Sequence, residues 1–225
     1  MTAISVIVPA FNAAATVAES LLSVRTQTLA PEEVILVDDG SSDDTVERAV
    51  DACPGLIVVR QSHAGAAAAT NAGLRAARAP LVALLDADDL WPSDKLETQA
   101  ARLAADPALD GVGGHVRSFL CPSLSTADAA RFRLPGAPQP SLLGGALMVR
   151  RAAHARVGDY DETLPVGFAI DWIHRARLAG LRLEVLDDVV LLRRIRGGSL
   201  SGPSAERDRG YLEMARRAIA RTRGT

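Results

Sequence analysis

The chain has 225 residues, 48% of them hydrophobic, and a formal net charge of −2. These values predict one compact domain with a full hydrophobic core, and the balanced charge argues against a general nucleic-acid-binding protein. The only cysteines are Cys53 and Cys121, which excludes a disulfide framework or a CxxC zinc site and favours a reducing compartment. With no leader-like N-terminus and no apolar run of roughly 20 residues, we expect a cytoplasmic protein, with peripheral membrane contact left open.

The first half of the chain alternates apolar runs with helical patterns. This alternation predicts an α/β fold with a parallel sheet and crossover helices. Strands are expected at Ile4–Val8, Val34–Val37, Leu56–Val59 and Leu81–Leu85, and helices at Ala14–Thr26, Asp44–Ala52 and Ala66–Ala77.

The second half is less regular, and no linker clearly separates two domains. We expect helices at Ser93–Ala105, Arg150–Val157 and Phe168–Ala179, strands at Gly111–Leu120, Gly144–Val149, Leu183–Leu186 and Val189–Arg193 with a hairpin at Asp187 and Asp188, and a long proline-rich loop over Cys121–Pro140. The predicted division is one domain over 1–205, with a nucleotide-binding half (1–89) and an acceptor and catalytic half (90–205), followed by a basic C-terminal helix (206–225).

Three carboxylates crowd together where the apolar run 80–85 ends, at Asp86, Asp88 and Asp89. So many like charges are costly unless a positive group lies against them. A divalent cation carrying a phosphate suits oxygen ligands, and open α/β sheets bind ligands beyond the carboxyl ends of their strands. The alternative is a solvated acidic turn that caps the following helix.

Two other predicted strands end in comparable polar groups. Phe11 and Asn12 follow the first strand, and Asp38 and Asp39 follow the second. An aromatic ring can stack on a flat base, and a carboxylate can accept a hydrogen bond from a base N–H. Phe11 could instead pack under the next helix, and the second strand end could be a capping turn. Taken together, the three strand ends predict a site for a nucleoside diphosphate and a metal ion.

Segments along nearly the whole chain resemble inverting family 2 glycosyltransferases with the GT-A fold. They are SVIVPAFNA (5–13), SVRTQT (23–28), EEVILVDDGSSDDT (32–45), LLDADDLWPSDKL (84–96), VGDYDETLP (157–165), IDWIHRARLAG (170–180) and RRIRGGSLS (193–201). The resemblance implies a single domain with a Rossmann-type, mostly parallel sheet flanked by helices. It also implies transfer of a sugar, with inversion, from a nucleoside-diphosphate sugar, expected to be a UDP-sugar.

The same resemblance implies roles for individual residues. The implied nucleotide-binding residues are Pro9, Phe11, Asn12, Asp39, Asn71, Asp86 and Arg196, with Phe11 and Asp39 at the base. Asp88 and Asp89 would hold Mn²⁺ or Mg²⁺, and Gly144, Gly145 and Trp172 would lie near the donor sugar and acceptor. Asp171 would be the general base, although it could also be a helix-surface acid beside Arg175.

Three positions depart from the family pattern. Ile170 stands where an acid often precedes the base, Thr70 stands where an arginine often precedes the asparagine, and Arg196 stands where a histidine often ligates the metal. Arginine stays protonated, so Arg196 is expected to bind the diphosphate instead.

Two rival functions stay open. One is a catalytically silent nucleotide-sugar-binding protein, and the other is a sugar-phosphate nucleotidyltransferase, for which the segment after the first strand lacks the expected basic residues. The acceptor is not readable from the sequence: it could be a saccharide, a lipid-linked sugar, a peptide or a small metabolite, and no nucleic-acid partner is expected.

Overall fold

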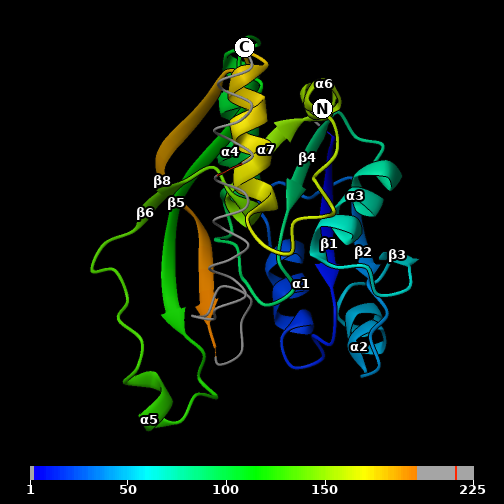
Figure 1. Cartoon of the computed structure of the whole chain (residues 1–225), viewed down its shortest axis with the longest axis vertical. Helices are drawn as coiled ribbons and strands as arrows, with labels where there is room; N and C mark the ends of the chain where they lie inside the picture. The colour runs from blue at the N-terminus through cyan, green and yellow to red at the C-terminus, as the bar shows by residue number, and fades with distance from the viewer. Residues whose placement is uncertain (1–2, 197–215, 217–225) are drawn as a thin grey trace.

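Eight strands form one mixed, mostly parallel sheet in this computed structural model, which describes residues 3–196 and 216 (Figure 1). The strands are β1 (Ile4–Ala10), β2 (Glu33–Asp38), β3 (Ile57–Arg60), β4 (Leu81–Leu84), β5 (Gly111–Leu120), β6 (Gln139–Ser141), β7 (Met148–Arg150) and β8 (Leu183–Ile195). Their order is β3-β2-β1-β4-β7-β5-β6, and β8 pairs with β5. The expected single-domain α/β fold is confirmed.

The parallel half of the sheet carries a reversal of strand order. β1 pairs in parallel with β2 on one side and with β4 on the other, so the chain moves outward from β1 to β3 and then returns to the opposite side of β1. Such a reversal leaves room for a ligand beyond the carboxyl ends of the strands. It lies between β1 and β4, beside the residues that follow those strands.

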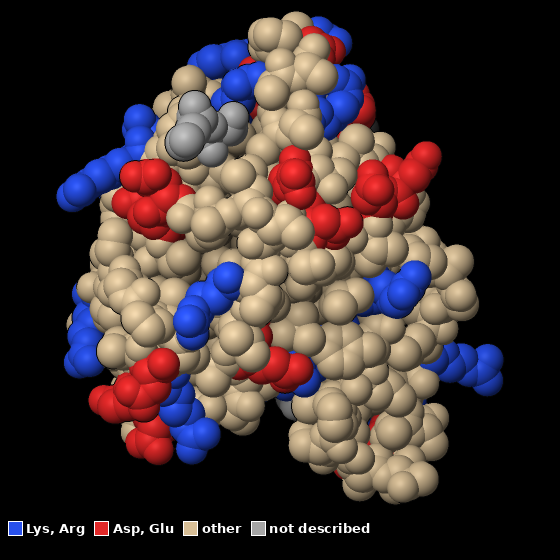
Figure 2. Space-filling model, turned by 180° about the vertical axis from the view of Figure 1, so that it is seen from behind, with Lys and Arg blue, Asp and Glu red and all other residues tan. Residues whose placement is uncertain are grey.

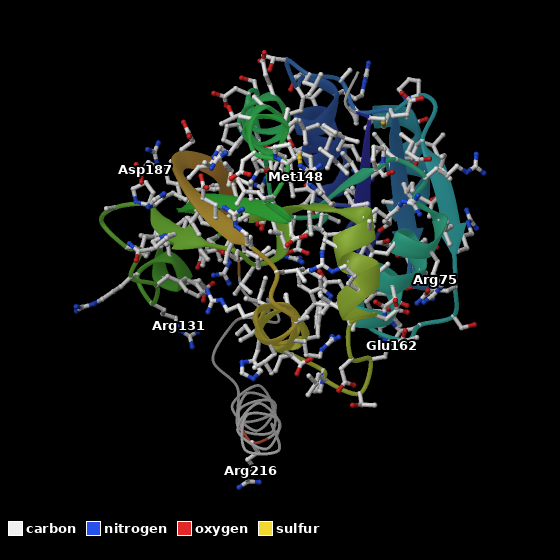
Figure 3. All side chains as sticks on the ribbon, turned by 90° about the horizontal axis from the view of Figure 1, so that it is seen from above. Arg75, Arg131, Met148, Glu162, Asp187 and Arg216 are labelled. Atoms are coloured by element: carbon white, nitrogen blue, oxygen red, sulfur yellow. The ribbon has the colours of Figure 1, made fainter. Side chains whose placement is uncertain are left out.

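Helices cover both faces of the sheet because successive strand residues point to opposite sides. In β1, Val6 and Val8 join one hydrophobic cluster and Ile7 joins the other. The first cluster takes in residues of α1 (Val17–Arg25), α2 (Thr45–Ala52) and α4 (Lys95–Ala105), and the second takes in residues of α3 (Ala66–Ala76), α6 (Arg151–Val157) and α7 (Phe168–Leu178). Figure 3 shows the fully buried Met148 of β7 near the middle of the molecule, between these layers.

Two expectations for the second half were wrong. Gly144–Ala146 forms a turn of 3₁₀ helix, so only Met148 and Val149 of the expected strand are β structure, and β7 extends to Arg150. Asp187 and Asp188 do not form a hairpin, because β8 runs through them in parallel with β5. The register shifts between Gly113 and His115, which indicates a bulge that absorbs the extra residues of β8.

The loop expected over 121–140 contains a short helix, α5 (Thr126–Ala129), which lies away from the helix layers in Figure 1. The expected basic helix at 206–225 falls outside the described residues, apart from Arg216. In the part of the chain that the structure describes, no helix has the length and apolar character needed to cross a membrane. The face in Figure 2 carries interspersed acidic and basic side chains.

Candidate functional site

The polar residues that follow β1, β2 and β4 meet at one edge of the sheet. The backbone N–H of Asp39 donates to the carbonyl of Ala10 at 2.9 Å, and the N–H of Leu85 donates to the carbonyl of Ile7 at 3.0 Å. The three strand ends are therefore held in register. Phe11, Asp39 and Asp86 come from segments distant in sequence and lie at the same end of neighbouring strands.

Phe11 is accessible at this edge. The residue is 45% exposed, so the alternative in which it packs under the following helix is wrong. Its ring stacks on the imidazole of His63, with 4.1 Å between ring centroids and 25° between ring planes. Sequence reasoning did not assign a role to His63. The stack shows that the surface of Phe11 accepts a flat ring.

Asp39 is almost completely buried and is surrounded by donors. Its Oδ1 accepts hydrogen bonds from Gln61 Nε2 at 2.7 Å and from the N–H of Ala64 at 2.9 Å. Its Oδ2 accepts from the N–H of Gly65 at 2.9 Å and lies 2.9 Å from His63 Nδ1. Both oxygens are thus engaged within the protein, and a base N–H could bind Asp39 only by replacing one of these donors.

The neighbouring turn engages two further candidates. Asn12 has a positive φ of 48°, and its Oδ1 accepts a hydrogen bond from the N–H of Ser42 at 2.9 Å. Asp38 accepts from the N–H of Ser41 at 3.0 Å. Pro9 lies within β1, paired with Val37 of β2. The side chains of Asn12 and Asp38 therefore shape the turn, as the capping interpretation expected for the second strand.

Asn71 is enclosed within the protein. It is fully buried on α3, and its amide donates to the carbonyl of Tyr160 at 3.0 Å and to Glu162 Oε1 at 2.9 Å. Its Oδ1 accepts from the N–H of Tyr160 at 2.9 Å. Figure 3 shows Glu162 on the same side of the molecule as Arg75 of α3. These contacts tie the segment before α7 to α3 and leave Asn71 no exposed polar atom for a nucleotide.

The three acids after β4 have different surroundings. Asp86 is exposed, and a Cβ placed on Gly144 would lie 3.6 Å from its Oδ2. Asp88 is partly buried, and its Oδ2 accepts a hydrogen bond from Arg196 Nε at 2.8 Å. Asp89 is 4% exposed, and its Oδ1 accepts from the backbone N–H of Arg194 at 2.8 Å. Asp86 and Asp88 therefore face outward, whereas Asp89 points inward.

Two of these carboxyl groups bind protons more tightly than an ordinary aspartate. Loss of water around the carboxylate, and then the charge of Asp88, raise the pKa of Asp86 to about 6, while Arg193 acts to lower it. Burial and then the charges of Asp86 and Asp88 raise the pKa of Asp89 to about 8, although the Arg194 N–H and Arg193 act in the opposite direction. The negative charge of the cluster is therefore only partly compensated within the protein.

Arg194 anchors the acidic turn, and sequence reasoning missed it. Its Nε donates to the carbonyl of Asp88 at 2.8 Å, and its NH2 group forms an ion pair with Glu19 at 2.6 Å. The guanidinium also lies over the ring of Phe119, 4.9 Å from its centroid. The side chain is 4% exposed. The RRIR segment pointed to this region, but only the tertiary structure separates buried Arg194 from Arg196.

The Gly144–Ala146 turn lies against the acidic turn formed by residues 86–89, and two buried side chains hold its carbonyl groups. Trp91 Nε1 donates to the carbonyl of Gly145 at 2.9 Å, and Gln99 Nε2 donates to the carbonyl of Ala146 at 2.8 Å. Gly144 has a positive φ of 48°, a conformation that favours glycine. The turn thereby reaches the neighbourhood of Asp86. Sequence reasoning placed Gly144 and Gly145 near the donor but missed Trp91 and Gln99.

Asp171 lies in the first turn of α7 and is completely buried. Its Oδ2 accepts a hydrogen bond from Arg175 Nε at 2.9 Å, one turn further along the helix. Arg175 also donates to the carbonyls of Val157 and Asp159 at 2.9 and 2.7 Å. The alternative interpretation placed Asp171 on the helix surface beside Arg175. The surface position is wrong, because Asp171 is buried, but the pairing with Arg175 is confirmed. The base role of Asp171 stays a prediction.

Trp172 packs in the interior and cannot contact a sugar in this conformation. The residue is fully buried, its Nε1 donates to the carbonyl of Gly158 at 3.0 Å, and its ring stacks on His154. The expected position of Trp172 near the donor sugar and acceptor stays a prediction, and it would have to act through its neighbours and not by direct contact. The physical reason is that Trp172 points into the core between α6 and α7, as its membership of the second hydrophobic cluster shows.

The donor set after β4 suits a hard divalent cation, although it is not a preformed cage. Within residues 3–196 and 216, no three or more His, Cys, Asp or Glu side chains are arranged to hold a metal ion. The outward carboxylates of Asp86 and Asp88 nevertheless provide oxygen ligands. Loss of water contacts is the larger cause of the raised pKa of Asp86, and the charge of Asp88, which a cation would offset, is the second. Asp89 is less suitable than expected, because it points inward to the Arg194 N–H.

Comparison with known proteins assigns the family. Residues 5–151, which contain all three strand ends and the Gly144–Ala146 turn, match the family model described as glycosyl transferase family 2. The chain belongs to this family. The expected glycosyltransferase relationship is confirmed at that level, while Asp171 and Arg196 lie outside the matched stretch.

Relatives and solved structures agree with this assignment. The chain is 30% identical to the succinoglycan biosynthesis protein ExoU of Rhizobium meliloti over 97% of this chain and 69% of that protein. It is 36% identical to WfgD of Escherichia coli, named as a UDP-Glc:alpha-D-GlcNAc-diphosphoundecaprenol beta-1,3-glucosyltransferase, over 44% of this chain and 40% of that protein. S. aureus TarS 1-349 in complex with UDP-GlcNAc has a TM-score of 0.74 and 22% identity, covering 97% of this chain and 66% of that chain. The TarS likeness confirms the GT-A-type fold.

Proposed function

We propose that this family 2 protein transfers a sugar from a UDP-sugar to an acceptor hydroxyl with inversion at the anomeric carbon. The observation that carries the proposal is the meeting of an exposed aromatic ring, Phe11, with the acids Asp39, Asp86 and Asp88 beside the reversal of strand order. The TarS structures with UDP-GlcNAc and UDP, and the UDP-Glc in the name of WfgD, support a uridine nucleotide as the donor.

The nucleotide would lie across the three strand ends. Its base stacks on Phe11, and its ribose and diphosphate lie toward Asp86 and Asp88. Mn²⁺ or Mg²⁺ held by Asp86 and Asp88 would offset charge on the departing nucleoside diphosphate. Arg196, whose guanidinium already reaches Asp88, supplies a fixed positive charge with the fork geometry that suits phosphate oxygens.

We assign the general base to Asp171. In the proposed step, the acceptor oxygen bonds to the anomeric carbon from the face opposite the diphosphate, the bond from that carbon to the diphosphate oxygen breaks, and the acceptor proton passes to the base. One displacement of this kind inverts the configuration. Because Asp171 is completely buried and paired with Arg175, the acceptor can reach it only if the first turn of α7 moves. We therefore propose that acceptor binding shifts this turn.

The acceptor is left as a saccharide, a lipid-linked sugar, a peptide or a small metabolite. The name of WfgD contains a lipid-linked acceptor, but the chain spans 40% of that relative. The shared segment covers 44% of this chain, so the acceptor in the name of WfgD is not carried over to this protein.

A catalytically silent nucleotide-sugar-binding protein is the second candidate. The burial of Asp171 and its ion pair with Arg175 favour it, because a base must reach its substrate. Hydrolysis of UDP-sugars discriminates between the two candidates. Slow release of free sugar that depends on Asp171 supports the enzyme, whereas nucleotide binding without any turnover on a broad panel of acceptors supports the silent protein.

Calorimetry with UDP tests the shared premise of both candidates. We expect UDP to bind, and to bind more tightly with Mn²⁺ or Mg²⁺ than with a chelator. Phe11→Ala should lower the affinity by about 1–3 kcal/mol, because one stacked base contact is lost. Val50→Ala, at a 48% exposed apolar residue on α2, is the matched control and should bind UDP normally. An equal loss of UDP affinity in Phe11→Ala and Val50→Ala would contradict the proposed base site. UDP affinity that the chelator leaves unchanged would contradict the proposed metal.

A further inference from the structure

His63 meets the same two residues that the proposed base site uses. Its imidazole stacks on Phe11 with 4.1 Å between centroids, and its Nδ1 lies 2.9 Å from Asp39 Oδ2 and 3.2 Å from the Asp39 carbonyl oxygen. Both of these neighbours can only accept a hydrogen bond, so Nδ1 carries the hydrogen and donates. A flat ring that stacks on Phe11, donates N–H to the Asp39 carbonyl and lies against the Asp39 carboxylate takes the position that a nucleobase would need.

From these contacts we propose that the His63 side chain occupies the nucleobase position of the ligand-free protein and must leave before a nucleotide binds fully. The inference rests on the proposed function, because it assumes that Phe11 and Asp39 recognise a base. His63 then acts as a determinant of nucleotide affinity. It competes with the base for one aromatic face and for one carboxylate oxygen.

The remaining contacts of Asp39 explain why His63 is the group that leaves. The other three donors to its oxygens are the N–H of Ala64, the N–H of Gly65 and the amide of Gln61. The backbone donors are fixed by the start of α3, and the Gln61 amide binds Oδ1, the oxygen that His63 does not contact. The His63 side chain is 57% exposed, so it can rotate into solvent without opening the core.

The backbone beside His63 is held close to the end of β2. A Cβ placed on Gly40 would lie 3.0 Å from the backbone nitrogen of His63, and Gly40 has a positive φ of 79°. This close approach keeps the backbone of His63 against the turn that carries Asp39. Release of the imidazole therefore needs a change of side-chain rotamer and no movement of the loop.

The consequence for affinity follows from population shift. A protein whose competent state is populated at a fraction f binds its ligand with an apparent Kd raised by 1/f. If the imidazole covers Phe11 about nine-tenths of the time, removing it tightens base binding about tenfold. We expect this change in affinity only for ligands that carry a base. Among the candidate site residues, His63 contacts Phe11 and Asp39, the two residues proposed to bind the base.

Calorimetry with UDP and with inorganic pyrophosphate, both with Mn²⁺, tests the inference on the full chain. His63→Ala is expected to bind UDP about tenfold more tightly than the wild type and to bind pyrophosphate equally. Ser62→Ala changes the exposed neighbour in the same loop and is expected to leave both affinities unchanged. Unchanged or weaker binding of UDP by His63→Ala overturns the inference, since His63 would then be neutral or part of the wall that holds the base.

A crystal structure of the wild type with UDP gives a second, independent measurement. We expect the base on Phe11 and the imidazole rotated away from it; a base seated while His63 still stacks on Phe11 overturns the inference. If the proposed function itself is wrong, the wild type and His63→Ala both fail to bind UDP. The inference about His63 then falls as well. Failure of the inference alone leaves UDP binding by the wild type intact.

Discussion

Arg196 Nε donates to Asp88 Oδ2 at 2.8 Å, which joins the segment after β8 to the acidic turn after β4. The pair spans 108 positions of sequence and brings together the expected diphosphate ligand and an expected metal ligand. Both side chains are partly exposed, so the contact is open to a phosphate or a cation. The ion pair therefore compensates part of the acidic cluster in the absence of a nucleotide.

Replacing Arg196 by lysine should weaken UDP binding although the charge is kept. A lysine ammonium cannot reproduce the planar fork of donors, and hydrogen bonds to charged groups are worth about 1.5–3 kcal/mol. Calorimetry with UDP and Mn²⁺ measures the loss. Arg117→Lys, at an exposed arginine on β5, is the control. Wild-type affinity in Arg196→Lys would remove Arg196 from the diphosphate site.

Stability of the metal-free protein should fall as the pH rises. The pKa of Asp86 is raised to about 6 and that of Asp89 to about 8, from 3.8. The folded state thus holds more protons than the unfolded state between pH 3.8 and about 8, and the free energy of unfolding decreases with pH over that window. The stability that these two protonated carboxyl groups contribute is fully present below pH 3.8. It is lost as the pH rises through their pKa values in the folded protein, about 6 and about 8.

Denaturant unfolding in the presence of a chelator, at several pH values between 5 and 9, measures this dependence. Asp89→Asn should flatten the curve, because the amide does not ionise. Mn²⁺ should restore stability chiefly at the alkaline end, where the ionised carboxylates bind a cation that the unfolded chain does not. An Asp89→Asn curve that keeps the wild-type slope would show that another group causes the dependence.

Asp171→Asn should leave UDP binding nearly unchanged and reduce turnover by about 10²–10⁴-fold, because the amide cannot accept the acceptor proton. The fold should persist, since Arg175 keeps its two carbonyl acceptors at Val157 and Asp159. UDP-sugar turnover with an identified acceptor, or donor hydrolysis in its absence, is the readout. Asp159→Asn removes an exposed acid of the preceding turn and should remain active. Normal turnover in Asp171→Asn would place the base elsewhere.

Trp91→Phe should destabilise the protein and also loosen the site. The ring is kept, but the buried carbonyl of Gly145 loses its indole donor, at a cost of about 1–3 kcal/mol. Because the turn reaches Asp86 through Gly144, affinity for UDP-sugar should fall more than affinity for UDP.

Trp172→Phe provides the matched comparison for this prediction. It likewise removes an indole donor to a glycine carbonyl, that of Gly158, in the core between α6 and α7. Thermal unfolding should shift in both variants, and only Trp91→Phe should change the ratio of UDP-sugar to UDP affinity. The same ratio in both variants would show that the Trp91 contact is purely structural.

Local pattern determined much of the fold. The continuous apolar runs predicted β1 to β4 to within a few residues. β1, β2 and β4 are largely buried and need no polar alternation, whereas β3 lies at the edge of the sheet and is partly exposed. Local pattern also predicted that Phe11, Asp39 and Asp86 follow strands of a parallel sheet, since strand-helix alternation implies crossover connections. That β2 and β4 both lie beside β1 was decided by the tertiary structure. Pattern failed at Asp187 and Asp188, where turn-forming residues lie within a bulged strand paired with β5.

Only the tertiary structure decided which polar groups are available at the site. Asn71, Asp89 and Trp172 are turned inward by contacts with Tyr160, Arg194 and Gly158, and these partners lie 89, 105 and 14 positions away. Packing likewise brings the His63 imidazole against Phe11 and Asp39, which are distant from it in sequence. A sequence fixes the chemistry of each side chain and the period of each element. The direction in which a polar group points depends on donors and acceptors that packing brings from elsewhere, because a buried polar group must find a partner.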